Sequence, residues 1–159
     1  MNPKIEHLSQ KKLVGMRQTM TFATMNPAIL WSAFMPRKRE IPLMVGTDLY
    51  SLEVYPHNFF QSMSSTAEFD KWAAVEVSEN QSVPDGMEML VLPDGLYAVF
   101  VHYGPASEAK ATYDAIFRTW LPASDYRIDE RPHFAVMGDK YRHNDPQSEE
   151  EIWIPVRSK

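Results

Sequence analysis

The sequence contains no cysteine, no long apolar run and no strongly basic segment. Without cysteine there can be no disulfide, no thiolate nucleophile and no cysteine-ligated metal. No stretch approaches the roughly 20 apolar residues that a membrane-spanning helix needs. The first twelve residues (MNPKIEHLSQKK) lack the apolar core of a signal peptide. We therefore expect a cytoplasmic protein that does not associate with a membrane.

The charge balance disfavours nucleic acid as a direct partner. The chain carries 16 Lys and Arg against 21 Asp and Glu, a formal net charge of −5, and its longest basic run is Arg37–Arg39. Polyanions such as duplex DNA attract strongly basic surfaces. We expect no direct nucleic-acid binding.

Familiar catalytic motifs are also missing. There is no phosphate loop, no G-x-G-x-x-G, no H-E-x-x-H and no nucleophile elbow in the sequence. The five histidines do not have the spacing of metal ligands. We expect neither a metal nor a cofactor.

What is present is enough apolar material for one hydrophobic core. The chain has 159 residues, of which 44% are hydrophobic, so we expect a single domain over residues 1–159. Period-two alternation predicts half-buried strands, and apolar residues three or four apart predict helices. The expected strands are 12–22, 50–55, 71–78, 96–103, 133–137 and 151–156, with 87–92 as a connection or extra edge. The expected helices begin at Pro27 and after Gly104-Pro105, and end near Pro36 and at Pro122.

The order β-α-β-β therefore occurs twice, over about residues 11–79 and 86–157. Short connections between such elements favour an α+β fold with one antiparallel sheet and the helices on one face. LEVYP (Leu52–Pro56) and EIWIP (Glu151–Pro155) also resemble each other, each with a glutamate two residues before an aromatic. If this reflects duplication, Glu53 and Glu151 lie near a pseudo-twofold axis and face a shared groove.

Several short motifs are shared with a known family. They are VP-x-GM (Val83–Met87), P-x-G-x-YA-x-F (Pro93–Phe100), the Gly104-Pro105 helix start, WLP (Trp120–Pro122), NDP (Asn144–Pro146) and EIWIPV. In this order the chain resembles the GyrI-like effector-binding domain, densely over residues 69–156 and more loosely before them. Such domains occur as the ligand-binding parts of AraC-type and MerR-type transcription regulators and as stand-alone proteins.

The resemblance implies two β-α-β-β halves that share one sheet, with a ligand cleft at their seam on the face away from the helices. It implies lipophilic, cationic ligands and a glutamate on the last strand as their partner, which here is Glu151. Residues 1–12 are too few for a helix-turn-helix motif, so we expect a stand-alone effector-binding protein.

Strand alternation supports a site of this kind. It places Glu151 and Trp153 on one face of their strand and Ile152, Ile154 and Val156 on the other. A carboxylate beside an aromatic ring suits a cation, with roughly 0.5 to 2 kcal/mol of cation–π attraction. We expect Glu149 and Glu150 to be solvated and Glu151 to turn inward. The predicted ligand-binding residues are Glu151, Trp153, Trp72, Glu53, Tyr55 and Tyr97.

Three alternatives remain open at this stage. Glu151 could instead be a solvated residue that continues the acidic run before it. Members of the family that hydrolyse strained cyclopropane-containing compounds suggest an enzyme in which Glu151 acts as the base. A protein partner, as in gyrase modulation, is a further alternative, and the sequence does not indicate an oligomeric state.

Overall fold

The computed structural model describes residues 2–62 and 64–159. Its strands, in chain order, are β1 (Lys4–Leu8), β2 (Lys11–Met20), β3 (Leu49–Val54), β4 (Phe69–Val77), β5 (Glu88–Leu92), β6 (Gly95–Tyr103), β7 (Tyr126–Ile128), β8 (His133–Met137) and β9 (Glu149–Ser158). Its helices are α1 (Pro27–Phe34), α2 (Lys110–Ala115) and α3 (Leu121–Ala123). The shorter helical turns are η1 (Met35–Glu40), η2 (Phe59–Ser62), η3 (Ala106–Glu108) and η4 (Ile116–Trp120). Within these residues no helix combines the length and the apolar character that crossing a membrane requires.

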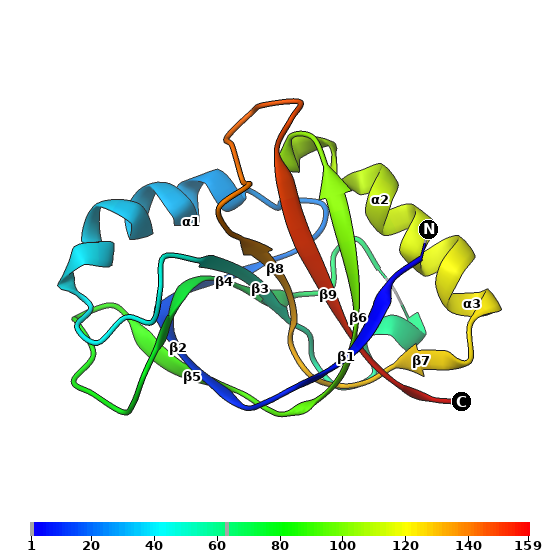
Figure 1. The fold of residues 1–159 in the computed structure, drawn as a ribbon, viewed down its shortest axis with the longest axis horizontal. Helices are drawn as coiled ribbons and strands as arrows, with labels where there is room; N and C mark the ends of the chain where they lie inside the picture. Colours follow the sequence, from blue (N-terminus) through cyan, green and yellow to red (C-terminus); the bar gives the residue numbers. More distant parts are fainter. Residues whose placement is uncertain (1, 63) are drawn as a thin grey trace.

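The sheet is antiparallel and its strand order reveals two related halves. The order is β1-β6-β9-β8-β3-β4-β2-β5, with β7 paired to β9. Outward from the seam between β3 and β8, the first half continues as β3, β4 and β2, and the second half as β8, β9 and β6. In each half these are the second, third and first strands of its β-α-β-β unit. The edges of the sheet are then β5 and β1. At the seam Glu53 of β3 is directly opposite His133 of β8. The sheet curls into a half-barrel with both helical segments on its outer side (Figure 1).

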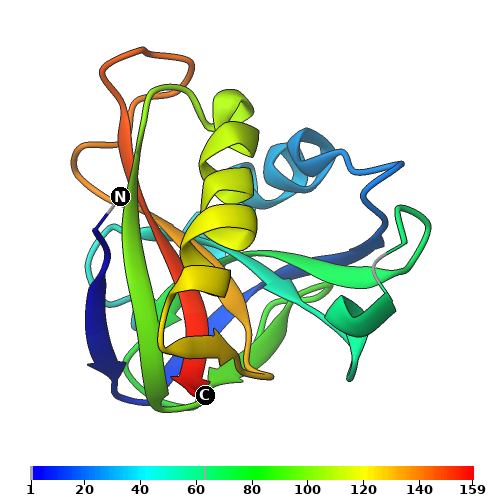
Figure 2. The same cartoon turned by 90° about the vertical axis from the view of Figure 1, so that its right-hand side faces the viewer.

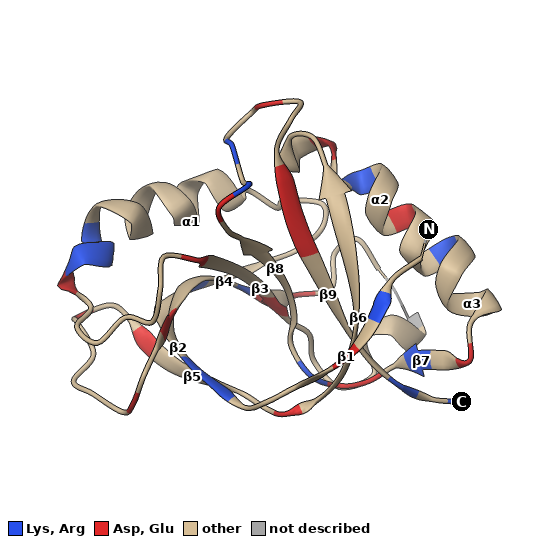
Figure 3. Cartoon of the chain, viewed as in Figure 1, with Lys and Arg blue, Asp and Glu red and all other residues tan. Residues whose placement is uncertain are grey.

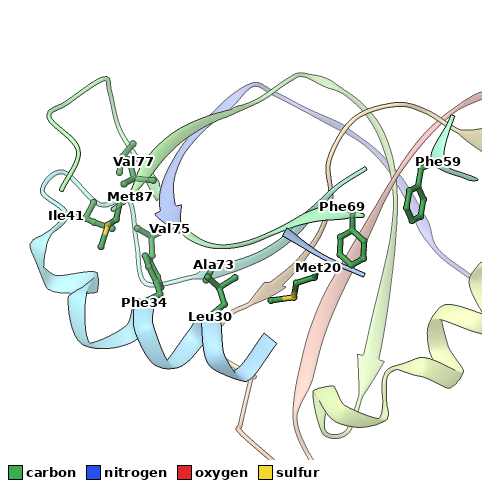
Figure 4. Packing of buried hydrophobic residues seen from close by; sticks show 11 residues of the cluster. Met20, Leu30, Phe34, Ile41, Phe59, Phe69, Ala73, Val75, Val77 and Met87 are labelled. Atoms are coloured by element: carbon green, nitrogen blue, oxygen red, sulfur yellow. The ribbon is translucent and has the colours of Figure 1, made fainter. Parts of the chain in front are cut away.

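The first helix forms and packs as its sequence predicts. Pro27 occupies the first turn, where its missing N–H costs no hydrogen bond. Leu30 and Phe34 are buried on the face that meets the sheet, and they point toward Ala73 and Val75 of β4 (Figure 4). This outer cluster anchors α1 over the first half of the sheet.

The second helical segment covers the other half. Figure 2 faces α2 and α3, which run in front of β6 and β9. Between them η4 is a π-helical turn, in which the N–H of Leu121 donates to the carbonyl of Ile116. Ile116 is fully buried against the outer side chains of the sheet, including Phe100 and Ile152. The predicted helix is therefore present, with one extra residue wound into its middle.

The inner side of the curl holds a separate apolar cluster. Its buried members are Leu8, Leu13, Tyr50, Leu52, Trp72, Ala74, Leu92, Tyr97, Val99 and Phe134. Both halves contribute to it, and Trp153 packs against it with its ring 5.3 Å from that of Phe134. The sheet thus has clusters of apolar side chains on both faces.

The predicted α+β class, with an antiparallel sheet and helices on one face, is confirmed. The short strands β1 and β7 were not predicted, because neither is long enough to show clear alternation. The expected relation between LEVYP and EIWIP is wrong. LEVYP falls on β3, the seam strand of its half, whereas EIWIP falls on β9, which is one strand away from the seam.

Candidate ligand-binding site

Five ionisable side chains are buried together on the outer face, where the strands pass between α1 and α2. None is more than 8% exposed. They come from five neighbouring strands, and they are Glu53 (β3), Lys71 (β4), His102 (β6), His133 (β8) and Glu150 (β9). Ionisable groups are seldom buried this fully unless they are paired or functional.

Two of these residues form an internal ion pair. Glu53 is directly opposite Lys71 in the register of β3 and β4. The ammonium of Lys71 donates to Glu53 Oε2 over 3.3 Å and to Ser51 Oγ over 2.7 Å. Burial raises the pKa of Glu53, and the neighbouring ammonium counteracts part of that rise.

Glu150 is the carboxylate that the protein leaves unpaired. The residue is 7% exposed, and within residues 2–62 and 64–159 no side chain or backbone N–H donates a hydrogen bond to its carboxylate. Burial raises its pKa, the nearby His102 and Lys71 lower it, and the negative charge of Glu53 raises it further. Glu150 lies in the acidic run at the start of β9 (Figure 3).

His102 holds the segment next to Glu150 in place. It is opposite Glu150 in the register of β6 and β9. Its Nε2 donates to the carbonyl of Pro105 over 2.9 Å, and its Nδ1 shares a hydrogen bond with the hydroxyl of Thr112 over 2.8 Å. Both partners belong to the start of the second helical segment, so His102 fixes that segment to the sheet beside Glu150.

Aromatic rings surround the same space. Phe60 of η2 stacks on the His133 ring at 5.3 Å and on Phe117 of η4 at 5.9 Å. Phe117 is in turn parallel to Tyr113 of α2, at 6.5 Å. Tyr55, which follows β3, meets His133 edge-on at 4.9 Å. These rings from both halves of the chain form an apolar wall next to the carboxylates.

Burial also sets the protonation state of the polar atoms in this wall. Although Tyr113 is partly exposed, its hydroxyl is deeply buried. Burial, followed by the negative charge of Glu53 and Glu150, raises the pKa of Tyr113 well above its ordinary value. Burial lowers the pKa of His133 to about 3. Both rings are therefore neutral near pH 7, so neither adds a charge beside the carboxylates and Lys71.

A pocket of about 180 Å³ opens beside these rings. It is lined by Val54, Tyr55, Pro56, Asn58, Phe59, Phe60, Gln61, Ile128, Asp129, Glu130, Arg131, Pro132, His133 and Arg157. A larger hollow of about 520 Å³ lies elsewhere, between charged side chains such as Asp139 and Arg142 of the loop from β8 to β9. That hollow has little apolar surface and lacks aromatic walls, so the smaller pocket is the better candidate for a ligand site. Of the five buried ionisable residues, His133 is the one that lines it.

The six residues predicted to form the site do not lie on one face of the sheet. Glu53 and Tyr55 are on the outer face with the buried ionisable groups. The other four are Trp72, Tyr97, Glu151 and Trp153, and they lie on the inner side of the curl. The expected shared groove for Glu53 and Glu151 is therefore wrong, because the sheet separates them.

The expectation that Glu151 turns inward while Glu150 is solvated is also wrong. Glu150 shares its face with Ile152 and Ile154, which pack under the second helical segment. Glu151 is exposed and accepts a hydrogen bond from the indole N–H of Trp153 over 3.1 Å. The predicted alternation of β9 is correct, but the face that carries the helices is not wholly apolar, because it includes Glu150.

The inner-face aromatic residues have structural contacts that account for their burial. Tyr97 is fully buried, donates its hydroxyl to the carbonyl of Pro132 over 2.8 Å, and lies under the guanidinium of Arg131 at 4.8 Å. Trp72 is 5% exposed and lies opposite Leu52 within the inner cluster. Their roles in ligand binding stay predictions, and the structure does not bring them to Glu150.

Lys71, Tyr113 and Phe117 are not among the residues predicted from the sequence to form the site. One available signal was the alternation of β4, in which Lys71 shares a face with the apolar residues Phe69 and Ala73. A lysine on an otherwise apolar strand face requires a buried partner. The opposing strand supplies that partner in Glu53.

Comparison with known proteins places this geometry in a family. The sequence matches the GyrI-like small molecule binding domain over residues 1–157. The chain belongs to this family. The resemblance inferred from the motifs is confirmed, and this GyrI-like domain is a small-molecule binding domain.

Relatives and solved structures agree with this assignment. The GyrI-like domain is 29% identical over 129 residues to the transcriptional regulator BrlR of Pseudomonas aeruginosa, covering 80% of this chain and 45% of BrlR. It is similar in fold to SAV2435 bound to tetraphenylphosphonium, with a TM-score of 0.72, 17% identity and coverage of 99% and 94% of the two chains. The EcmrR C-terminal domain gives a TM-score of 0.71 at 12% identity, covering 99% and 98%.

Proposed function

We propose that this GyrI-like domain binds a lipophilic cation at the seam of the sheet, on the face that carries the helices, with Glu150 as its charge partner. One observation carries the proposal. A buried carboxylate without a partner among the described residues lies beside a wall of aromatic rings from both halves of the chain.

The energetics favour a cation over other ligands. A carboxylate that leaves water without a partner loses several kcal/mol of solvation, which is why burial raises the pKa of Glu150. A cation entering the site restores the missing pairing, and the faces of Tyr113 and Phe117 add dispersion and cation–π attraction. Since neither contribution needs a fixed hydrogen-bond pattern, cations of varied shape suit the site.

The comparisons support the same ligand class. Tetraphenylphosphonium, present in the SAV2435 structure, is a cation whose charge is enclosed by four phenyl rings and which has no hydrogen-bond donor. The similarity to BrlR, a transcriptional regulator, supports a role as an effector module whose ligand changes the activity of a regulator.

A ligand of this size needs more room than the structure shows. Pockets for drug-sized ligands are about 300 to 1,000 Å³, whereas the pocket here is about 180 Å³. Phe60 occupies the space between Phe117 and His133 from a short helical turn. We infer that Phe60 moves aside when the ligand enters.

Neighbouring glutamates on opposite faces provide a matched test of the proposal. We expect Glu150→Gln to weaken the binding of a rhodamine-type cationic dye at least tenfold, about 1.4 kcal/mol, because it removes the buried charge. We expect Glu151→Gln to bind as the unchanged protein does. Dye fluorescence anisotropy measures both affinities.

The reverse pattern, in which only Glu151→Gln loses affinity, would place the ligand on the inner face and contradict the proposal. If both variants bound the dye as tightly as the unchanged protein, neither carboxylate would be the charge partner of the ligand. The hydrolase alternative gains no support from the structure at the residue named for it, because Glu151 is exposed and bonded to Trp153.

A further inference from the structure

Lys71 is an unexpected residue in a site proposed to receive a cation. Its side chain is 6% exposed, and its ammonium belongs to the same buried group of charges as Glu53 and Glu150. A fixed positive charge next to an incoming positive charge repels it unless something compensates. The position of Lys71 therefore needs an explanation in terms of ligand choice.

The structure holds Lys71 in this place. It lies in the middle of β4 between Phe69 and Ala73 on the same face, and β4 is paired on both sides, by β2 and β3. Its ammonium donates to Ser51 and Glu53. A lysine near the surface can extend its charge into water, but these contacts hold the ammonium inside.

The charges of the cluster then give a simple result. Lys71 Nζ lies 3.3 Å from Glu53 Oε2, so the charges of these two residues neutralise each other. His133 is neutral, and the hydrogen bonds of His102 to Pro105 and Thr112 are ones that an uncharged ring can make, so Glu150 is the remaining uncompensated charge of the buried group. With both carboxylates ionised and His102 uncharged, the site has a net charge of −1.

We propose that Lys71 determines the charge of the ligand: by neutralising Glu53 it leaves one uncompensated carboxylate, so that the site selects singly charged over doubly charged cations. This inference rests on the proposed function. Inside a protein an excess charge is costly because the surroundings solvate it poorly. A monocation brings the site to neutrality, whereas a dication leaves one positive charge in excess beside Lys71.

The inference makes Glu53 important without requiring it to touch the ligand. In Glu53→Gln the ammonium of Lys71 loses its partner and compensates Glu150 instead, so the site becomes neutral overall. A second change, Lys71→Met, removes that ammonium and restores the net charge to −1. Replacing a whole buried ion pair by uncharged side chains is often tolerated, unlike removing one member, so the double variant is the safer protein.

Ethidium and propidium provide matched probes, since both contain the same aromatic cation and propidium carries a second positive charge. We expect the unchanged protein to bind ethidium at least tenfold more tightly than propidium. Glu53→Gln should weaken ethidium binding at least tenfold, and Glu53→Gln with Lys71→Met should recover it to within about threefold. Lys71→Met alone should reduce the preference for ethidium at least tenfold. Isothermal titration measures the affinities, and circular dichroism checks that each variant is folded.

The outcomes separate this inference from the proposed function. If the double variant binds ethidium as weakly as Glu53→Gln, then Glu53 contacts the ligand itself and the role of Lys71 is wrong, while cation binding stands. If Glu53→Gln binds ethidium as tightly as the unchanged protein, the role of Lys71 is also wrong, while cation binding stands. If the unchanged protein binds neither ethidium nor propidium, and Glu150→Gln does not change the affinity for the rhodamine-type dye, both proposals fail. Should Lys71→Met alone not fold, the comparison of Glu53→Gln with the double variant still decides.

Discussion

His133 shows how strongly the surroundings of one residue control its charge. The ring lies opposite Glu53 at the seam and is enclosed by Tyr55, Phe60 and Phe117. Burial lowers its pKa from 6.5 to about 3. Folding therefore keeps a neutral imidazole beside the carboxylates, and a charged His133 would compete with a cationic ligand for Glu150.

This burial has a consequence for stability that depends on pH. Below pH 6.5 the unfolded chain binds a proton at His133 that the folded protein excludes, so the stabilising contribution is lost as pH falls from 6.5 toward 3. Between pH 7 and 4.5 we expect this residue to reduce the free energy of unfolding by up to about 3 kcal/mol. His133→Phe retains a ring and should remove that loss, which urea unfolding at the two pH values measures.

Glu53 and Glu150 act in the opposite direction and make a control necessary. Their raised pKa values mean that the folded protein binds protons more readily than the unfolded chain, so their contribution falls as pH rises above 4.5. The difference between the unchanged protein and His133→Phe isolates the histidine. The exposed His143→Phe should behave as the unchanged protein, and equal acid sensitivity in all three would show that His133 is not the cause.

At the scale of elements, Gly15 lets β2 fit between its neighbours. Gly15 is opposite Ala74 in β4 and Glu88 in β5. A Cβ at this position would meet the carbonyl oxygen of Ala73 and lie 2.6 Å from the Cα of Ala74. Because both neighbours are backbone atoms within the sheet, they cannot move away without disrupting the strand pairing.

We expect Gly15→Ala to destabilise the protein by on the order of 3 kcal/mol, measured by urea unfolding. Gly46→Ala is the matched control. Gly46 has a φ of 64° but nothing within 4 Å of the added methyl group, so only backbone strain of about 1 kcal/mol is expected. If both variants lost the same free energy of unfolding, the close contact between β2 and β4 would not be the reason for glycine at position 15.

The elements also show which features the sequence could predict. The long strands, both helices and the phase of β9 follow from the alternation of apolar residues, and the structure bears them out. Alternation tells which residues share a face, but not which face of a curled sheet receives the ligand. Both faces of this sheet carry clusters of buried apolar side chains. The position of Glu150 therefore depended on the arrangement of the two helices, which no local pattern records.

The π-helical turn is a further feature that local patterns could not predict. Apolar residues from Ala109 to Leu121 fit a regular helix by their spacing alone. The extra residue in η4 appears only when the segment packs on the sheet, with Ile116 buried and Phe117 directed to the rings of the site. π-helical turns are frequent near functional sites, and here the turn carries Phe117, which stacks on Phe60 beside the pocket.

At the scale of the whole molecule, the two halves share their interior. The inner cluster joins Leu13, Leu52 and Trp72 of the first half to Tyr97 and Phe134 of the second. Backbone pairing of β3 with β8 continues the sheet across the seam. The proposed ligand site takes Glu53 and Lys71 from the first half and His133 and Glu150 from the second, so separating the halves would also dismantle it. A single domain over residues 1–159 stays a prediction, and this shared interior suggests how to test it.

Phe134 is the residue at which the two halves can be tested together. Its ring lies 5.8 Å from Tyr50 of the first half and 5.3 Å from both Tyr97 and Trp153 of the second. We expect Phe134→Ala to reduce the free energy of unfolding by about 3 to 5 kcal/mol, since it leaves a cavity that both halves line. The reduction should be the same whether unfolding is followed in the first half or in the second, because the contacts of Phe134 are lost from the interior that the two halves share.

Trp31 packs in the cluster under α1 and Trp120 in the cluster under α2. Trp72 and Trp153 of the inner cluster emit in every variant, so the emission that is lost in Trp31→Phe gives the signal of the first half, and the emission that is lost in Trp120→Phe gives that of the second. If the molecule is one cooperative unit, urea midpoints from both variants coincide with that from far-UV circular dichroism, and Phe134→Ala shifts all three equally. The exposed Ile29→Ala should shift none of them. If the midpoints differ and Phe134→Ala shifts only one of them, the two halves unfold independently and the chain is not one cooperative unit.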